Sequence, residues 1–131
     1  VDATQDESFV VILHNCGNAS GQVTSMLFTG AKGLHFGNVV DMNQIMPQLP
    51  SEVLGFGNVD PLKVMKMGEA FDVKSRTLEL LEQMSKYRNF VLSTGCDVPL
   101  GATIENMDAF YKTLDIYNMT QAIRTKWLFG E

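Results

Sequence analysis

The sequence predicts an α/β fold with a parallel sheet, because short apolar runs alternate four times with stretches of helical periodicity. The runs are mostly apolar and lack strict alternation with polar residues, which is typical of strands buried on both faces of a parallel sheet. Each run ends in small or polar residues, where the chain is expected to turn. The predicted strands are FVVIL (9–13), GLHFGN (33–38), EVLGFGN (52–58) and NFVLSTGC (89–96).

The helices between these strands are predicted from capping residues and apolar spacing. Asp41 precedes a short amphipathic segment, and Asp60 stands before Pro61, which has no N–H to leave unpaired. Thr103 is the predicted cap of the last helix. Predicted helices cover residues 19–31, residues 42–49, a segment that begins at Pro61, residues 73–86, and residues 104 to beyond 117.

Length limits the number of domains, and composition limits the classes of partner. The 131 residues make one domain at most, and the 45% that are hydrophobic suffice for a core. A net charge of −5 argues against nucleic acid and against anionic membrane surfaces, which carry charge of the same sign. No apolar run approaches the roughly 20 residues that a membrane span needs.

The first residues and the cysteines indicate the compartment. The opening stretch VDATQDESF is polar and acidic, unlike the apolar segment of a secretory signal peptide. Two cysteines without features of secretion predict free thiols or metal ligands rather than a disulfide. We therefore expect a cytoplasmic protein.

Four parallel strands leave two open sheet edges, and open edges invite pairing with another chain. An eight-stranded barrel needs twice as many units and about 250 residues. The residues therefore predict either a small open α/β domain or half of a barrel, and we expect a homo-oligomer. Trp127, Leu128 and Phe129 in the tail either dock on a neighbour or finish the last helix.

Soft metal ligands stand at the ends of the first and fourth predicted strands. The first strand runs into His14 and Cys16, and the fourth ends at Cys96. Because the carboxyl ends of parallel strands share one rim, we expect these side chains to converge. Two thiolates and one imidazole form the type of three-ligand set that holds catalytic zinc and leaves a fourth position open. The alternative is a buried strand that merely ends in a turn.

The stretches HNCGN, HFGNVVDM, GFGNVDP and STGCDVP resemble the carboxyl-terminal part of the uroporphyrinogen decarboxylase superfamily. They are most similar to its zinc-dependent branch of corrinoid and coenzyme M methyltransferases. The resemblance implies the last four units of a (β/α)8 TIM barrel, so that residues 1–131 form a single partial domain. It also implies that the N-terminal half-barrel is missing and that this chain alone is not a competent enzyme.

The resemblance implies a cofactor and a partner as well. In the methyltransferase branch an H-x-C pair and a later cysteine bind zinc, and these positions fall on His14, Cys16 and Cys96. Zinc there activates a thiol that takes a methyl group from methylcobalamin carried by a corrinoid protein. No catalytic residue beyond these ligands is identified from the sequence.

Two other functions remain open. The decarboxylase branch uses no metal and acts on a porphyrinogen in porphyrin biosynthesis, and in that case the three residues would only line the substrate pocket. A third hypothesis is a non-catalytic module in which two half-barrels associate and close a ring.

Several further residues are candidates for the substrate pocket. His35 either lines the pocket or is a hydrogen-bonded structural histidine, and Asn58 either faces the pocket or satisfies the backbone of a turn. Asp97 either orients a metal ligand or belongs to a turn, and Asn38 completes the candidate set. Many zinc methyltransferases place an acidic residue at the end of the second strand. This chain has none there unless Asp41 reaches the site.

Overall fold

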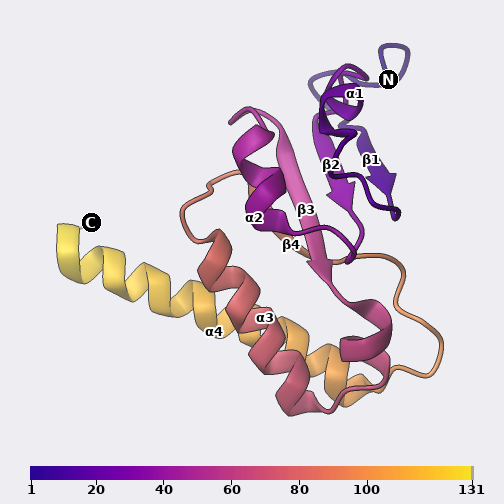
Figure 1. The fold of residues 1–131 in the computed structure, drawn as a ribbon. Coiled ribbons are helices and arrows are strands. Elements are labelled where there is room, and N and C mark those ends of the chain that lie inside the picture. Colours follow the sequence, from indigo (N-terminus) through magenta and orange to yellow (C-terminus); the bar gives the residue numbers. More distant parts are fainter. Residues whose placement is uncertain (131) are drawn as a thin grey trace.

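The computed structural model describes residues 1–130, and its centre is a sheet of four parallel strands in sequential order (Figure 1). The strands are β1 (Ile12–Asn15), β2 (Gly33–Phe36), β3 (Leu54–Val59) and β4 (Phe90–Thr94). The helical segments are α1 (Val23–Leu27), α2 (Met42–Ile45), η1 (Met46–Gln48), the π-helical η2 (Pro61–Lys66), α3 (Ala70–Met84) and α4 (Ile104–Phe129). Sequential parallel strands joined by helices are the architecture of half a TIM barrel, which confirms the predicted fold class.

The predicted caps lie where the sequence placed them. The Asp41 carboxylate accepts a hydrogen bond from the Asn43 amide and begins α2. The Asp60 carboxylate accepts from the amides of Leu62 and Lys63 at the start of η2. Thr103 caps α4 by accepting from Asn106. These are contacts between near neighbours in sequence, so side-chain type alone predicts them.

The first strand begins later than predicted. The apolar run starts at Phe9, but Phe9 and Val10 are 58% and 49% exposed, and the strand begins at Ile12. The reason is a turn in which the Asp6 carboxylate accepts from the amides of Ser8 and Phe9. As a result His14 lies within β1, opposite His35 of β2 in the parallel register.

The first helix is also shorter than the predicted range 19–31. Ala19 and Ala31 at the two ends of this range are buried, yet only Val23–Leu27 is helical. The Asn18 side chain accepts hydrogen bonds from the amide and hydroxyl of Ser20, which forms a turn instead of a first helical turn. The predicted bounds of this helix were therefore wrong.

The core consists of two apolar clusters, one toward each end of the sheet. The larger lies between the first three strands and the helices α1 and α2, with Leu34, Phe36 and Ile45 fully buried. The smaller joins β3 and η2 to α3 and α4 through Val59, Met65, Val73 and Phe110. The second cluster fixes the long helices against the sheet.

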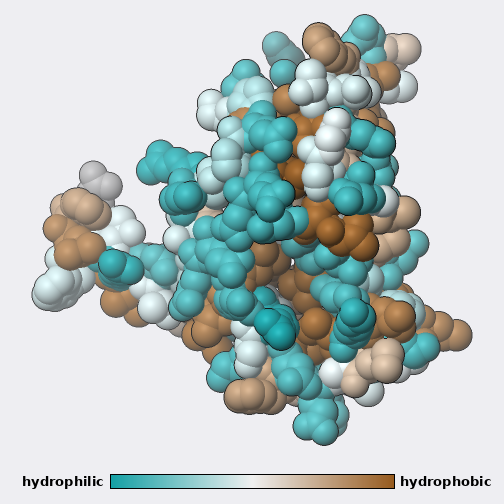
Figure 2. Space-filling model, in the orientation of Figure 1, coloured by the Kyte–Doolittle hydropathy of each residue, from teal (hydrophilic) through white to brown (hydrophobic). Residues whose placement is uncertain are grey.

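Helix α4 lies against α3 over its first half, and its C-terminal part projects away from the rest of the molecule (Figure 1). The space-filling view shows apolar side chains at this projecting end (Figure 2). Among residues 1–130, no helix combines the length and the apolar character needed to cross a membrane.

Candidate metal centre

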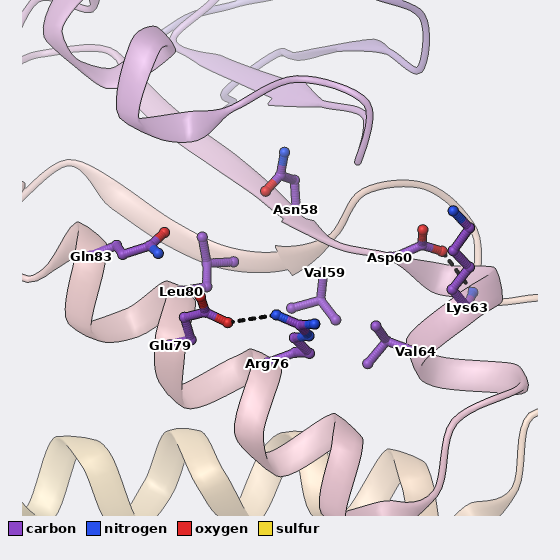
Figure 3. A pocket seen from close by; sticks show the side chains of 9 residues that line it. All are labelled: Asn58, Val59, Asp60, Lys63, Val64, Arg76, Glu79, Leu80 and Gln83. Atoms are coloured by element: carbon purple, nitrogen blue, oxygen red, sulfur yellow. Dashed lines mark hydrogen bonds and ion pairs between the residues drawn. The ribbon is translucent and has the colours of Figure 1, made fainter.

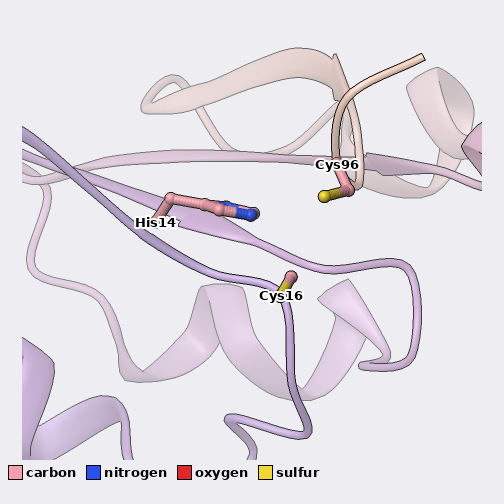
Figure 4. A group of neighbouring side chains, drawn as sticks. All are labelled: His14, Cys16 and Cys96. Atoms are coloured by element: carbon pink, nitrogen blue, oxygen red, sulfur yellow. The ribbon is translucent and has the colours of Figure 1, made fainter. Parts of the chain in front are cut away.

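Three soft donor side chains meet at the carboxyl end of the sheet (Figure 4). His14 belongs to β1, Cys16 follows that strand, and Cys96 follows β4. The candidate ligand atoms of the three residues all lie within 4.8 Å of one another. His14 and Cys16 are exposed and Cys96 is half-buried, so a small molecule can reach the group.

The spacing of these atoms fits a zinc ion. Zinc–sulfur bonds of about 2.3 Å and zinc–nitrogen bonds of about 2.0 Å in a tetrahedron place donor atoms about 3.5–3.8 Å apart. The 4.8 Å limit exceeds that separation by about 1 Å. Small rotations of exposed side chains cover such a difference. Two sulfurs and one imidazole nitrogen also match the preference of zinc for soft ligands, with one position left open.

Strand order alone does not explain how Cys96 reaches His14. Strands β1 and β4 are the two outer strands of the sheet, which are three spacings of about 4.8 Å apart if the sheet is flat. The residue before Cys96 closes this distance. Gly95 lies so close to the backbone of Asn38 that a Cβ atom there would collide with the Asn38 amide nitrogen. The chain leaving β4 therefore crosses over the end of β2 toward β1.

A second close backbone contact, between Gly37 and Cys16, holds Cys16 in position. A Cβ atom added to Gly37 would lie 2.5 Å from the carbonyl oxygen of Cys16. Only glycine permits this contact, because any side chain would push the Cys16 backbone away. On the other side, Asn15 accepts from the Gly17 amide and donates to the Gln22 side chain. The backbone that carries Cys16 is thus held from both directions.

His35 connects the two parts of the group. The His14 Nδ1 atom lies 3.3 Å from the His35 carbonyl oxygen, and the two rings stand with centroids 4.4 Å apart. The His35 Nε2 atom lies 2.7 Å from the carbonyl oxygen of Thr94. The Thr94 hydroxyl in turn donates to the carbonyl of Cys96. A continuous path of contacts therefore runs from His14 through His35 and Thr94 to Cys96.

These contacts also assign the tautomer of His14. When Nδ1 donates its proton to the His35 carbonyl, Nε2 carries the free lone pair that a metal needs. The other ring nitrogen of metal-bound histidines is commonly held in this way by a carbonyl or carboxylate. Thr94 and the His35 carbonyl were not recognised from the sequence, because their partners lie on other strands.

The remaining candidates mostly hold backbone or other side chains. Asn58 donates to the carbonyls of Gly37 and Val40, so its amide closes the turn after β2. Asn38 donates to the Asp60 carboxylate, 3.0 Å away. Asp97 is exposed directly after Cys96. The Asp41 carboxylate is occupied as the cap of α2 and does not join the three donors.

A separate hollow of about 400 Å³ lies between the end of β3, η2 and α3 (Figure 3). Several of its polar side chains already have partners. Arg76 forms an ion pair of 2.9 Å with Glu79, and Asp60 caps η2. The three soft donors do not line this hollow, which leaves the strand-end group as the candidate site for chemistry.

Comparison with known proteins places the chain in a family. The model of the family described as uroporphyrinogen decarboxylase (URO-D) matches residues 1–117. The chain belongs to the uroporphyrinogen decarboxylase family. The family predicted from the strand-end motifs is therefore confirmed. No curated protein matches the chain.

A solved structure gives a second comparison. A methyltransferase from Methanosarcina mazei matches with a TM-score of 0.68 at 22% sequence identity. The match covers 83% of this chain and 32% of that chain, so the family member described here spans about a third of that enzyme's length. At this identity the likeness establishes a shared fold. This shared fold agrees with the half-barrel formed by the four sequential parallel strands and their helices.

Proposed function

We propose that His14, Cys16 and Cys96 hold a zinc ion and that the chain is the C-terminal half-barrel of a zinc-dependent methyltransferase. The observation that carries this proposal is the convergence of three soft donor atoms within 4.8 Å. The shared fold with a methyltransferase supports it. Bound zinc would lower the pKa of an acceptor thiol at its open position, so that the nucleophilic thiolate predominates at neutral pH.

The residues of this chain supply position and access. The His35 carbonyl keeps the proton of His14 on Nδ1 and leaves the lone pair of Nε2 free to bind a metal. Close packing at Gly37 and Gly95 fixes the backbones that carry Cys16 and Cys96. The exposure of His14 and Cys16 leaves the open side of the group accessible to a thiol. On the methyltransferase assignment, that thiol would be coenzyme M or a similar acceptor.

The proposal also names what the chain lacks. The methyl donor would be a methylated cobalamin on a separate corrinoid protein. An N-terminal half-barrel, absent from a chain that covers 32% of the compared enzyme, would complete the substrate pocket. A second copy of the half-barrel closing the ring is the alternative way to cover the open strand edges.

Zinc content tests the proposal directly. The wild-type protein, Cys96→Ser and Glu52→Gln would be loaded with zinc, freed of weakly bound metal by gel filtration, and examined by elemental analysis. We expect about one zinc per wild-type chain and per Glu52→Gln chain, and little in Cys96→Ser, because two ligands hold zinc far more weakly than three. Glu52→Gln is the control because it removes an exposed carboxylate before β3, at the other end of the sheet. Equal, negligible zinc in all three proteins would contradict the proposal.

A metal-free decarboxylase is the second candidate, favoured by the description of the matching family. In that case His14 and the two cysteines would line a porphyrinogen pocket without a metal. The complete protein would then convert a porphyrinogen after treatment with a chelator, and would not transfer methyl groups to thiols.

A further inference from the structure

The C-terminal part of α4 differs from the rest of the fold. The family match ends at residue 117, whereas the helix continues to Phe129. We call residues 118–129 the α4 extension. All of its residues except Gln121 are exposed, and Figure 1 shows it leading away from α3. It lies apart from the candidate metal centre and does not depend on the function proposed above.

An apolar stripe begins just before the α4 extension and runs along it. Its members are Ile116, Met119, Ile123 and Trp127, which are 61%, 65%, 67% and 84% exposed. Their spacing of three, four and four residues places them on one narrow face. A narrow seam with this spacing is the pattern by which two helices pack along each other.

The stripe does not continue the face of α4 that packs on α3 and the second apolar cluster. In the first half of α4 the buried side chains are Asn106, Phe110 and Thr113, and the Tyr117 hydroxyl donates to the Leu81 carbonyl on the same side. At 3.6 residues per turn, the stripe lies roughly 100° around the helix from that face. The stripe therefore needs a partner other than the core of its own chain.

Charge placement indicates what this partner is. Between Ile116 and Gly130 the only charged residues are Arg124 and Lys126, and Asp115 stands immediately before the stripe. Asp115 and Lys126 are 126 − 115 = 11 residues apart, about three helical turns, so both flank the stripe on the same side. An antiparallel pair of identical helices places Lys126 of each copy near Asp115 of the other. A parallel pair would leave Asp115 of one copy and Lys126 of the other about three turns apart, with no such charge pairing.

We propose that the α4 extension packs antiparallel against the same segment of a second copy of this chain. The contact is isologous, so each copy contributes the same stripe and the same two flanking charges. Pairing removes the four large apolar side chains from water. It also supports a helical segment that is too short to gain much stability alone.

Measurement of mass against concentration tests the proposal. By light scattering on the full chain, we expect the wild-type protein to shift from one to two chains per particle as its concentration rises. Ile123→Glu places a charge in the middle of the seam on both copies and should raise the dimer Kd about a hundredfold or more. Leu100→Glu is the control. Leu100 is 97% exposed and lies before α4, so this variant should dimerise as the wild type does.

The charge pair tests the antiparallel arrangement. Lys126→Glu and Asp115→Lys should each raise the dimer Kd by about fivefold, because each dimer loses two exposed ion pairs. The double variant restores opposite charges and should recover most of the wild-type affinity. Circular dichroism confirms that each variant keeps its helix content.

Three outcomes would overturn the proposal. The first is a wild-type chain that stays monomeric at every concentration. The second is a dimer that survives Ile123→Glu, which would assign association to another surface such as the open sheet edges. The third is a double charge variant no better than the single ones, which would exclude the antiparallel arrangement.

Discussion

The candidate metal centre at the carboxyl ends of the strands, which we call the rim, exposes reactive side chains, and the α4 extension exposes apolar ones. The two regions are held together by different kinds of contact. At the rim, residues from β1 and from the loop after β4 converge, and contacts through His35 and Thr94 hold them. In the extension, residues that are neighbours in sequence share a face because the helix is regular. The rim depends on the whole sheet, whereas the extension depends on one helix.

This difference predicts how each region responds to substitution. A change of backbone packing at the rim should disturb both stability and metal binding, because one set of contacts serves both. A change in the extension should leave the domain intact and alter association alone. The following predictions test that contrast, from the largest expected effect to the smallest.

Gly95→Ala should have the largest effect. The added Cβ would collide with the Asn38 amide nitrogen, so the chain that carries Cys96 must shift away from β1. We expect a loss of about 2–4 kcal/mol in the free energy of unfolding, as for other overpacked or strained sites, together with weak zinc binding. Urea denaturation and zinc titration measure the two effects. Gly21→Ala is the matched control, because a Cβ there has no atom within 4 Å. An unchanged Gly95→Ala protein would show that this contact does not position Cys96.

His35→Phe should weaken zinc binding while leaving most of the fold intact. The substitution removes the hydrogen bond from the His35 ring to the Thr94 carbonyl, and with it the link between the two halves of the site. Loss of such a supporting contact typically weakens metal affinity about 10–100-fold. Competition with a zinc indicator measures the affinity.

His35→Gln separates this positioning role from a general packing effect. Its amide retains a hydrogen-bond donor, so it should recover part of the zinc affinity that His35→Phe loses. Equal affinity in the wild type and His35→Phe would mean that His35 only fills space beside His14.

Paired glycine substitutions compare the two halves of α4. Ala109 packs against the second apolar cluster, whereas Ala122 lies in the exposed extension. Each substitution disfavours the helix by about 1 kcal/mol. Ala109→Gly should lower the stability of the whole domain by at least that amount. Ala122→Gly should weaken dimer formation and leave the unfolding midpoint of the dilute protein unchanged. Urea titrations at low concentration distinguish the two, and equal shifts would contradict the contrast.

Asp6→Asn should have the smallest effect on stability. Hydrogen bonds from the Ser8 hydroxyl, and then from the amides of Ser8 and Phe9, hold the pKa of the Asp6 carboxyl below its usual value of 3.8. The lowered pKa means that its stabilising contribution is complete above about pH 4 and is lost as the pH falls through the folded-state pKa. Wild type and Asp6→Asn should therefore differ slightly in melting temperature at pH 7 and converge near pH 2. A difference that grows on acidification would contradict this assignment.

The sequence predicted the family and the fold class from local features. Alternating apolar runs and helical stretches predicted four parallel units, and the motifs around the strand ends predicted the family that matches residues 1–117. Residue type and position also predicted the caps at Asp41, Asp60 and Thr103. The bounds of β1 and α1 were wrong because side chains of Asp6 and Asn18 form turns that compete with strand and helix.

The sequence by itself determined the residue types at the rim and the spacing of the apolar stripe on α4, since both follow from the order of neighbours along the chain. Only the tertiary structure decided that Cys96 crosses to His14, that His35 joins the outer strands, and that Asn58 closes a turn. The physical reason is the range of the contacts. Helical periodicity and capping act over a few residues, whereas these contacts join segments far apart in the sequence and depend on the close approaches at Gly37 and Gly95.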